Sequence, residues 1–320
     1  MQVAERIYQV QLPLPFALRS VNCYLLRDDA GWTIVDSGLN TPDGRAAWHV
    51  AFADLGIEPR MISRIVLTHY HPDHYGMAGW LQRQSGAQVL LAPREIASAQ
   101  IYWGKPDDAP DPTIALFSAY GVPNELTEAI VYEVDRLRSM TFPHPEVTPL
   151  LPGTLLTMGG RAFRAIHTPG HSDGQLIFYA ADEQLALVGD QVLIKISPHI
   201  GFWPDSEPDP LGRYLTSLTE LRALDVTLAL PGHGPLISDW SGRIDQLLAH
   251  HEERLALMRS AVGEAASAFQ VATQVFPFGR YTAHEKRFAV AETIAHLELL
   301  VVRGQLRKDR GAYWVYRSVE

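Results

Sequence analysis

Nine consecutive residues, Thr68 to Gly76, concentrate side chains that bind metal ions. They read Thr-His-Tyr-His-Pro-Asp-His-Tyr-Gly, which places three imidazoles and one carboxylate between positions 69 and 74. Imidazole nitrogen and carboxylate oxygen both suit zinc and related first-row ions. A polar loop that is rich in histidine by chance is the alternative, but this density of ligands favours a metal site.

The sequence around this run indicates how its side chains are presented. Residues 64–67 (Arg-Ile-Val-Leu) form a short, largely apolar and β-branched stretch that is typical of a buried strand. Side chains alternate along an extended chain, so His69 and His71 point to the same side. Pro72 suits the first position of a helix, and Asp73 suits its first turn. The end of a strand and the start of a helix can therefore direct four ligands into one small volume.

Four more residues that can bind metal stand just after apolar strands, beside glycine or proline. They are Asp36 in Val-Asp-Ser-Gly, His171 in Thr-Pro-Gly-His, Asp190 in Val-Gly-Asp and His233 in Pro-Gly-His-Gly. Glycine lets the backbone approach closely and take a positive φ, as a tight ligand loop requires. Each motif alone is weak evidence, but together with the nine-residue run they predict one site.

Other residues are candidates for supporting roles. His167 precedes the loop that carries one of these histidines and is a candidate for orienting a metal ligand. His199, Phe202 and Trp203 lie in a later segment that we expect to border the site, where they are candidates for contact with the substrate.

Composition limits the classes of protein that fit. The chain has 320 residues, of which 47% are hydrophobic and 20% charged, an ordinary balance for a globular protein of more than one domain. The formal net charge of −9 argues against a protein that binds nucleic acid over its whole surface. Cys23 is the only cysteine, so no intrachain disulfide is expected. The first residues do not resemble a secretory signal and no apolar run is long enough to span a membrane, so we expect a cytoplasmic protein.

The predicted elements have the order of a layered α+β protein. The first hundred residues are expected to run β-β-β-α-β-α-β, with one helix over about 73–84, and this order recurs loosely in the second half. Such an order suits two sheets packed face to face with helices outside. Residues 97–147 interrupt it with a turn-rich stretch and a helix to about Met140, and we interpret them as an insertion. The insertion either acts as a lid that shapes the substrate site or only covers core.

The motifs resemble those of the metallo-β-lactamase superfamily of hydrolases. The matching segments are Thr68-His69-Tyr70-His71-Pro72-Asp73-His74, Thr168-Pro169-Gly170-His171, Gly189-Asp190 and Pro231-Gly232-His233-Gly234. The resemblance implies a catalytic domain over residues 1–255, built as a four-layer αβ/βα sandwich with a two-metal site at one edge of the sheets. Its complete His-x-His-x-Asp-His run is most similar to the glyoxalase II, ribonuclease and lactonase branches. True β-lactamases typically place a cysteine on the second metal, whereas Cys23 lies in an early strand.

The resemblance also implies a role for each ligand. Two divalent metal ions would occupy the site, with zinc favoured and iron or manganese as alternatives. His69, His71 and His171 would hold the first ion, Asp73, His74 and His233 would hold the second, and Asp190 would bridge both. Asp36 would support the ligands without binding metal.

The expected activity is hydrolysis. Two divalent ions about 3.5–4 Å apart activate water near neutral pH and stabilise the attacking and leaving oxygens. Asp73 is the candidate catalytic group, as the acceptor of a proton during attack. An ester or thioester of a small molecule is the favoured substrate. RNA, a lactone, a persulfide oxidised at a single iron, and a non-catalytic role in nucleic-acid binding are the alternatives.

Residues 256–320 are predicted to form a separate C-terminal domain. Helices over 265–276 and 282–303 followed by a hairpin resemble a winged-helix unit, which some members of the superfamily carry. From residue 256 onward there are nine Lys and Arg and six Asp and Glu, with Arg307, Lys308 and Arg310 on the expected wing. The hairpin either contacts phosphate of RNA or of a CoA-like substrate, or it packs on the catalytic domain or on a second subunit of a homodimer.

Overall fold

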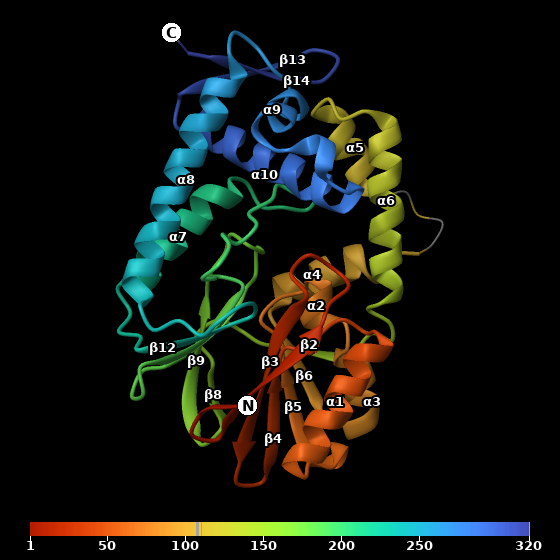
Figure 1. Cartoon of the computed structure of the whole chain (residues 1–320), viewed down its shortest axis with the longest axis vertical. Helices are drawn as coiled ribbons and strands as arrows, with labels where there is room; N and C mark the ends of the chain where they lie inside the picture. Colours follow the sequence, from red (N-terminus) through yellow and green to blue (C-terminus); the bar gives the residue numbers. More distant parts are fainter. Residues whose placement is uncertain (107–108, 110, 320) are drawn as a thin grey trace. The chain divides into compact units, whose positions relative to one another are not determined.

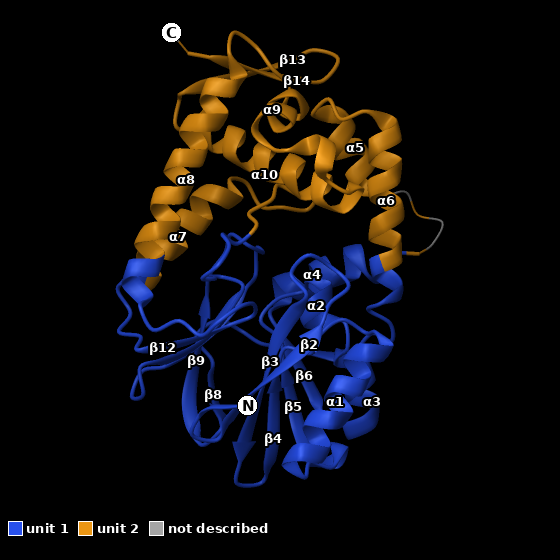
Figure 2. Cartoon of the chain, in the orientation of Figure 1, with its two compact units in different colours: residues 1–105, 137–198, 222–243 blue, residues 106–136, 199–221, 244–320 orange. Residues whose placement is uncertain are grey.

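The computed structural model describes residues 1–106, 109 and 111–319 (Figure 1). Asp107, Asp108 and Pro110 of the predicted insertion and Glu320 of the predicted C-terminal domain lie outside the described residues. The chain divides into two compact units (Figure 2). Unit 1 comprises Met1–Lys105, Leu137–Pro198 and Arg222–Arg243, and unit 2 comprises Pro106–Arg136, His199–Leu221 and Ile244–Glu320.

The first sheet of unit 1 has seven strands that are adjacent in chain order. They are β1 (Gln2–Ala4), β2 (Ile7–Pro13), β3 (Ser20–Asp28), β4 (Gly31–Val35), β5 (Ile62–Val66), β6 (Gln88–Leu91) and β7 (Val147–Pro149). β1 to β4 pair antiparallel through short turns, whereas β4 to β7 pair in parallel. Parallel neighbours need longer crossover connections, which here contain helices. The carboxyl ends of β4 and β5 therefore lie side by side.

The helices that follow these strands have clear local signals. The first connection contains α1 (Pro42–Leu55) and the short η1 (Pro59–Met61), and α4 (Pro93–Tyr102) follows β6. Thr41 caps α1 by accepting a hydrogen bond from the Gly44 N–H at 3.0 Å, and Gly56 ends it with a left-handed φ of 64°.

The single helix predicted over about 73–84 is wrong. The structure has two helices there, α2 (Pro72–Tyr75) and α3 (Ala78–Ser85). The Met77 N–H donates to the carbonyl of Gly38 at 2.8 Å instead of continuing the helical ladder. This tertiary hydrogen bond stops the helix just after the ligand residues.

The second sheet of unit 1 packs against the first. Its strands are β8 (Leu155–Met158), β9 (Arg161–His167), β10 (Leu176–Ala180), β11 (Leu185–Gly189) and β12 (Leu228–Pro231), in the order β12-β11-β10-β9-β8. Only β11 and β12 pair in parallel. Ile7, Val66, Phe163, Phe178 and Leu230 are fully buried in one hydrophobic cluster drawn from both sheets, and burying each such side chain contributes about 1.5–3 kcal/mol. Two mixed sheets with a shared core are confirmed, while the four-layer arrangement stays a prediction.

Unit 2 is mainly helical. It contains α5 (Pro112–Ala119), α9 (Ala268–Val275), η2 (Phe278–Arg280), α10 (Ala283–Val302), β13 (Leu306–Arg310) and β14 (Trp314–Ser318). It also contains most of α6 (Asn124–Ser139), α7 (Pro210–Arg222) and α8 (Trp240–Val262), each of which has one end in unit 1. Ser267 and Thr282 begin α9 and α10 with reciprocal capping boxes. The predicted order of two helices and a hairpin is present, and the winged-helix classification stays a prediction.

The middle of the predicted insertion, residues 106–136, belongs to the same unit as the C-terminal segment, whereas residues 97–105 and 137–147 belong to unit 1. The Lys308 ammonium donates to the Tyr120 hydroxyl at 2.8 Å and lies 2.5 Å from Glu298 Oε1. The Tyr120 and Tyr316 hydroxyls donate to the same Glu298 oxygen at 3.1 and 2.5 Å. These contacts join α5, α10 and the hairpin, so the segment after residue 105 does not pack as an isolated insertion. The domain boundary at residue 255 stays a prediction.

Among the described residues, no helix combines the length and apolarity needed to cross a membrane.

Candidate metal centre

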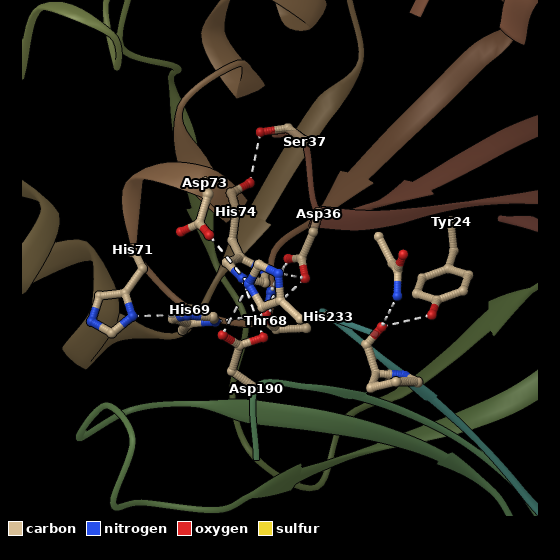
Figure 3. A network of polar contacts seen from close by, with 12 residues as sticks. Tyr24, Asp36, Ser37, Thr68, His69, His71, Asp73, His74, Asp190 and His233 are labelled. Carbon is tan, nitrogen blue, oxygen red and sulfur yellow. Dashed lines mark hydrogen bonds and ion pairs between the residues drawn. The ribbon is translucent and has the colours of Figure 1, made fainter. Parts of the chain in front are cut away.

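The candidate ligands lie on loops at the ends of strands in unit 1. The run Thr68–Gly76 follows β5, and His171 lies between β9 and β10. Asp190 and His233 follow β11 and β12, which are parallel neighbours, so their loops leave the same edge of the sheet. The packing of the two sheets brings all of these loops together, and Figure 3 shows Asp190 and His233 beside the side chains of the nine-residue run.

One group consists of three imidazoles. His69 Nε2 lies 3.1 Å from His71 Nδ1, which in turn lies 2.9 Å from His171 Nε2. Two nitrogens bound at 2.0–2.1 Å to a tetrahedral zinc ion would be about 3.3–3.4 Å apart. Both distances are therefore within about half an ångström of this spacing, and the ligand atoms of all three residues lie within 4.8 Å of one another.

A second group combines imidazoles with carboxylates. His233 Nε2 lies 3.2 Å from Asp73 Oδ2 and 3.3 Å from Asp190 Oδ2, and His74 Nε2 lies 3.4 Å from Asp190 Oδ1. Asp190 Oδ2 is also 3.7 Å from His171 Nε2 of the first group. Asp190 thus stands between the two groups.

The donor atoms fit a metal pair. His74 Nε2, His233 Nε2 and Asp190 Oδ1 are buried, and none of them makes a hydrogen bond that meets normal geometry with a described residue. His74 Nε2 and His233 Nε2 face the Asp190 carboxylate at 3.4 and 3.3 Å without the geometry of a hydrogen bond, which costs about 1–3 kcal/mol for a buried polar atom and would be offset by a bound metal ion. Imidazole and carboxylate together match the preferences of zinc and its neighbours.

The electrostatics of the two groups differ. Burial, reinforced by the neighbouring imidazoles, holds the pKa of His69 and of His71 well below 6.5, so both are neutral donors. Burial alone would raise the pKa of Asp73, but the adjacent imidazoles outweigh it and hold the pKa at about 2. Burial would lower the pKa of His233, but Asp190 and Asp73 raise it to about 10. Without metal, the second group is therefore an ion-paired cluster.

Asp36 organises the nine-residue run from behind. Its carboxylate accepts hydrogen bonds from the Thr68 N–H at 2.8 Å and the Thr68 hydroxyl at 2.9 Å, and it lies 2.8 Å from His74 Nδ1 (Figure 3). Asp36 itself has a φ of +59°, a left-handed conformation that is uncommon outside glycine and occurs at functional sites. Asp36 therefore lies where the predicted supporting role requires it.

The His233 loop is held by β3 of the opposite sheet. His233 Nδ1 lies 2.8 Å from the Ser20 carbonyl, which fixes the ring so that Nε2 faces the cluster. The Tyr24 hydroxyl and the Asn22 side-chain amide donate to the Pro231 carbonyl at 2.7 and 3.0 Å. The loop of the second sheet that carries the candidate ligand His233 is thus anchored to the first sheet.

Glu95 of α4 is a buried acid at the site that the sequence did not single out. Burial raises its pKa to about 7, while hydrogen bonds from the Tyr70 and Gly174 N–H groups limit the rise. An acid in the first turn of a helix is ordinary on dipole grounds alone. The sequence therefore carried no signal that this carboxylate faces the ligand loops.

The predicted role of His167 stays untested. The side chain is exposed, and its Nε2 lies 2.8 Å from the carbonyl of Asp173. The imidazole thus contacts the backbone of the loop that carries His171. Among the described residues, the hydrogen bond of the His167 side chain goes to this backbone and not to a candidate ligand side chain.

The three predicted substrate contacts lie in unit 2. His199 Nε2 is 3.0 Å from the Phe288 carbonyl, and the His199 ring packs against Trp203 at 5.6 Å. The Phe202 N–H donates to the carbonyl of Ala291 at 3.0 Å. All three residues therefore pack near α10, and their contact with a substrate stays a prediction.

Known families match both parts of the chain. Residues 17–233 match the profile of the Metallo-beta-lactamase superfamily. The chain belongs to the metallo-beta-lactamase superfamily. Residues 255–319 of this superfamily member match a second profile, the metallo-beta-lactamase-like C-terminal domain.

Two curated relatives are informative. The "Probable metallo-hydrolase YqjP" of Bacillus subtilis is 27% identical over an alignment 335 residues long. The alignment covers 98% of this chain and 97% of the relative. The "Atrochrysone carboxyl ACP thioesterase" of Aspergillus fumigatus is 26% identical over 243 residues, which cover 76% of this chain and 59% of the relative.

Solved structures agree on the fold. The metallo-beta-lactamase family protein TTHA1429 of Thermus thermophilus superposes with a TM-score of 0.89 at 33% identity, covering 99% of this chain and 100% of the other. A beta-lactamase domain protein of Burkholderia ambifaria gives 0.87 at 28% identity, covering 100% and 94%. TTHA1623, solved in a di-iron-bound form, gives 0.51 at 25% identity, covering 74% and 98%.

Superfamily membership and the His/Asp clusters together identify the chain as a metal-dependent hydrolase.

Proposed function

We propose that this superfamily member hydrolyses an ester or thioester of a small molecule with the help of two divalent metal ions. The observation that carries the proposal is a set of three overlapping groups of possible ligands, in which Asp190 lies 3.7 Å from His171 and 3.3 Å from His233. In this proposal the first ion is held by His69, His71 and His171, the second by Asp73, His74 and His233, and both by Asp190. Zinc is the proposed metal, and iron is the alternative because TTHA1623 was solved in a di-iron-bound form.

The residues of the chain would divide the chemistry among them. A bound metal pair lowers the pKa of water and polarises the carbonyl under attack. The imidazoles of His69 and His71 are already neutral, so they would bind a metal ion without first losing a proton. Asp73 is ionised, because the adjacent imidazoles hold its pKa at about 2, so its carboxylate would bind metal without losing a proton. We propose Asp73 as a metal ligand and, from its place beside the other ligands, as the acceptor of a proton from the attacking water.

One relative favours a thioester as the substrate, and ion pairs on the hairpin argue against RNA. The Aspergillus fumigatus relative is described as a carboxyl ACP thioesterase. On the hairpin, Lys308 pairs with Glu298 at 2.5 Å, and Arg307 and Arg317 approach Asp309 at 3.7 and 3.3 Å. Cations that are already paired contribute less to the binding of a phosphate backbone. We propose that residues 256–319 form a winged-helix-like unit with a packing role.

The test is a substrate panel with metal-loaded protein. Acyl-CoA and acyl-glutathione thioesters, aryl esters, lactones and single-stranded RNA are offered at equal concentration. We expect hydrolysis of thioesters or esters that disappears in a His69→Ala/His71→Ala variant and after treatment with a chelator. Cleavage of RNA without any hydrolysis of esters or thioesters would refute the proposal.

A further inference from the structure

Glu95 binds two of the ligand loops at once. It lies in the first turn of α4 with a fully buried side chain. Its Oε2 accepts a hydrogen bond from the Tyr70 N–H at 2.8 Å, and its Oε1 accepts one from the Gly174 N–H at 2.6 Å. Each carboxylate oxygen therefore serves a different loop.

These two loops carry the first ligand group. Tyr70 is the residue between His69 and His71, and Gly174 follows His171 by three positions. A single carboxylate on a helix thus connects the backbone segments that present all three imidazoles. Rotation of the Tyr70 peptide would turn both neighbouring side chains.

The carbonyl of Tyr70, which belongs to the next peptide group, is held as well. The indole N–H of Trp103 donates to the Tyr70 carbonyl at 2.8 Å. The Tyr70 ring stacks on Tyr102, with centroids 5.5 Å apart and planes 19° from parallel. The two ends of α4 therefore hold the backbone between the two histidines.

The second loop is shaped to reach Glu95. A Cβ on Gly174 would lie 2.9 Å from Glu95 Oε1 and 2.7 Å from Arg94 Cβ, so only glycine allows this approach. Arg94 Nη2 also lies 2.8 Å from Asp173 Oδ2 in the same loop. Neighbouring residues of α4 thus hold neighbouring residues of the loop.

We infer that Glu95 is a positioning residue that sets the geometry of the His69, His71 and His171 group. Asp36 is its counterpart at the other group, where it contacts His74. The inference rests on the proposed function, because it assigns Glu95 to the first of the two proposed metal positions. Supporting residues of this kind typically change metal affinity about 10- to 100-fold when they are lost.

Glu95→Gln is the sharpest substitution. Glutamine keeps the shape of the side chain, but its amide nitrogen is a donor and would face one of the two backbone N–H groups. One hydrogen bond is lost and a donor–donor contact replaces it. Glu292→Gln is the matched control, because Glu292 is a largely buried acid in unit 2 that pairs with Arg254 at 3.7 Å.

Metal affinity of each group is measured separately by competition between apo-protein and a zinc chelator. A His233→Ala background keeps the first group, and a His171→Ala background keeps the second. We expect Glu95→Gln to weaken zinc binding about 10- to 100-fold in the first background and to leave it unchanged in the second. Glu292→Gln should change neither.

An unchanged affinity in both backgrounds, or an equal loss in both, would overturn the role of Glu95. Should Glu95→Gln fail to fold, Glu95→Asp carries the same test, because the shorter side chain keeps the charge but cannot reach both N–H groups. The same loss of zinc affinity in the first background alone is expected, and an affinity that is unchanged in both backgrounds, or lowered equally in both, would overturn the inference. Wild-type protein that binds zinc in this pattern but hydrolyses no ester or thioester would refute the proposed function alone.

Discussion

Acid should destabilise unit 2, because α8 and α10 bury two neutral histidines against each other. His251 and His296 are 1% and 0% exposed, and His251 Nδ1 lies 3.3 Å from His296 Nε2. His296 Nδ1 lies 2.8 Å from the Glu292 carbonyl, which can only accept, so this nitrogen carries the proton. His296 Nε2 is then the acceptor for His251. Protonation of His296 would set two N–H donors face to face.

The sign and size of the effect follow from the two pKa values. Burial, with nearby positive or imidazole groups such as Arg254 and His250, lowers the pKa of His251 to about 2 and that of His296 to about 3. The unfolded chain binds protons at about 6.5, so between about pH 6.5 and 3 the unfolded state holds more protons and stability falls as pH falls. Between pH 7 and pH 5 each histidine therefore lowers the free energy of unfolding by about 2 kcal/mol, and the pair lowers it by about 4 kcal/mol.

The assay is urea unfolding of the metal-free protein at pH 7 and pH 5. The double variant His251→Leu/His296→Leu removes both titrating rings and leaves no donor without its acceptor. Histidines of the metal centre titrate in both proteins, so their contribution cancels in the comparison. Between pH 7 and pH 5 the free energy of unfolding of the wild type should fall by about 4 kcal/mol more than that of the variant. The same pH dependence in both proteins would refute the reasoning.

Three further predictions concern the metal centre. Asp190→Asn should lower turnover of the metal-loaded enzyme about 10³-fold or more, because the residue between the two groups loses its charge; steady-state kinetics beside a chelator-treated wild type measure this, and near-normal turnover would contradict it. Gly232→Ala should weaken zinc binding, because a Cβ there would overlap Asp190 Oδ1 and lie 2.6 Å from His74 Cε1. Gly279→Ala is the control, because a Cβ there meets nothing within 4 Å. In competition with a zinc chelator, Gly232→Ala should bind zinc more weakly than Gly279→Ala does. Metal binding should release protons, because His233 has a pKa of about 10 without metal and must be neutral to bind it. Zinc affinity should accordingly rise with pH, and calorimetry in two buffers of different ionisation enthalpy should show the proton release; identical heats would count against it.

The chemistry of the protein could be predicted from the sequence because its signals are local. The spacing of His69, His71, Asp73 and His74 follows the periods of a strand and a helix, which act over a few residues. Helix starts such as Thr41-Pro42 are equally local, since the cap bonds to an N–H three positions away.

The extent of the helices and the grouping of segments depended on distant partners. The helix after the ligand run stops because Met77 bonds to Gly38, a residue in another loop. The segment around Tyr120 joins the C-terminal helices because Glu298 and Lys308 contact its hydroxyl. Neither partner can be recognised from the sequence next to the residue it binds.

The sequence by itself determined that four candidate metal ligands stand in one short run and that three more lie in loops beside glycine or proline. Only the tertiary structure decided that these loops meet at one edge, with Asp190 between the two groups. It also decided that the Glu95 carboxylate accepts a hydrogen bond from the N–H of Gly174, which lies 79 positions away in the chain. The physical reason is that ligand spacing is set by short-range backbone geometry, whereas contacts between loops arise only when packing of the two sheets closes the chain.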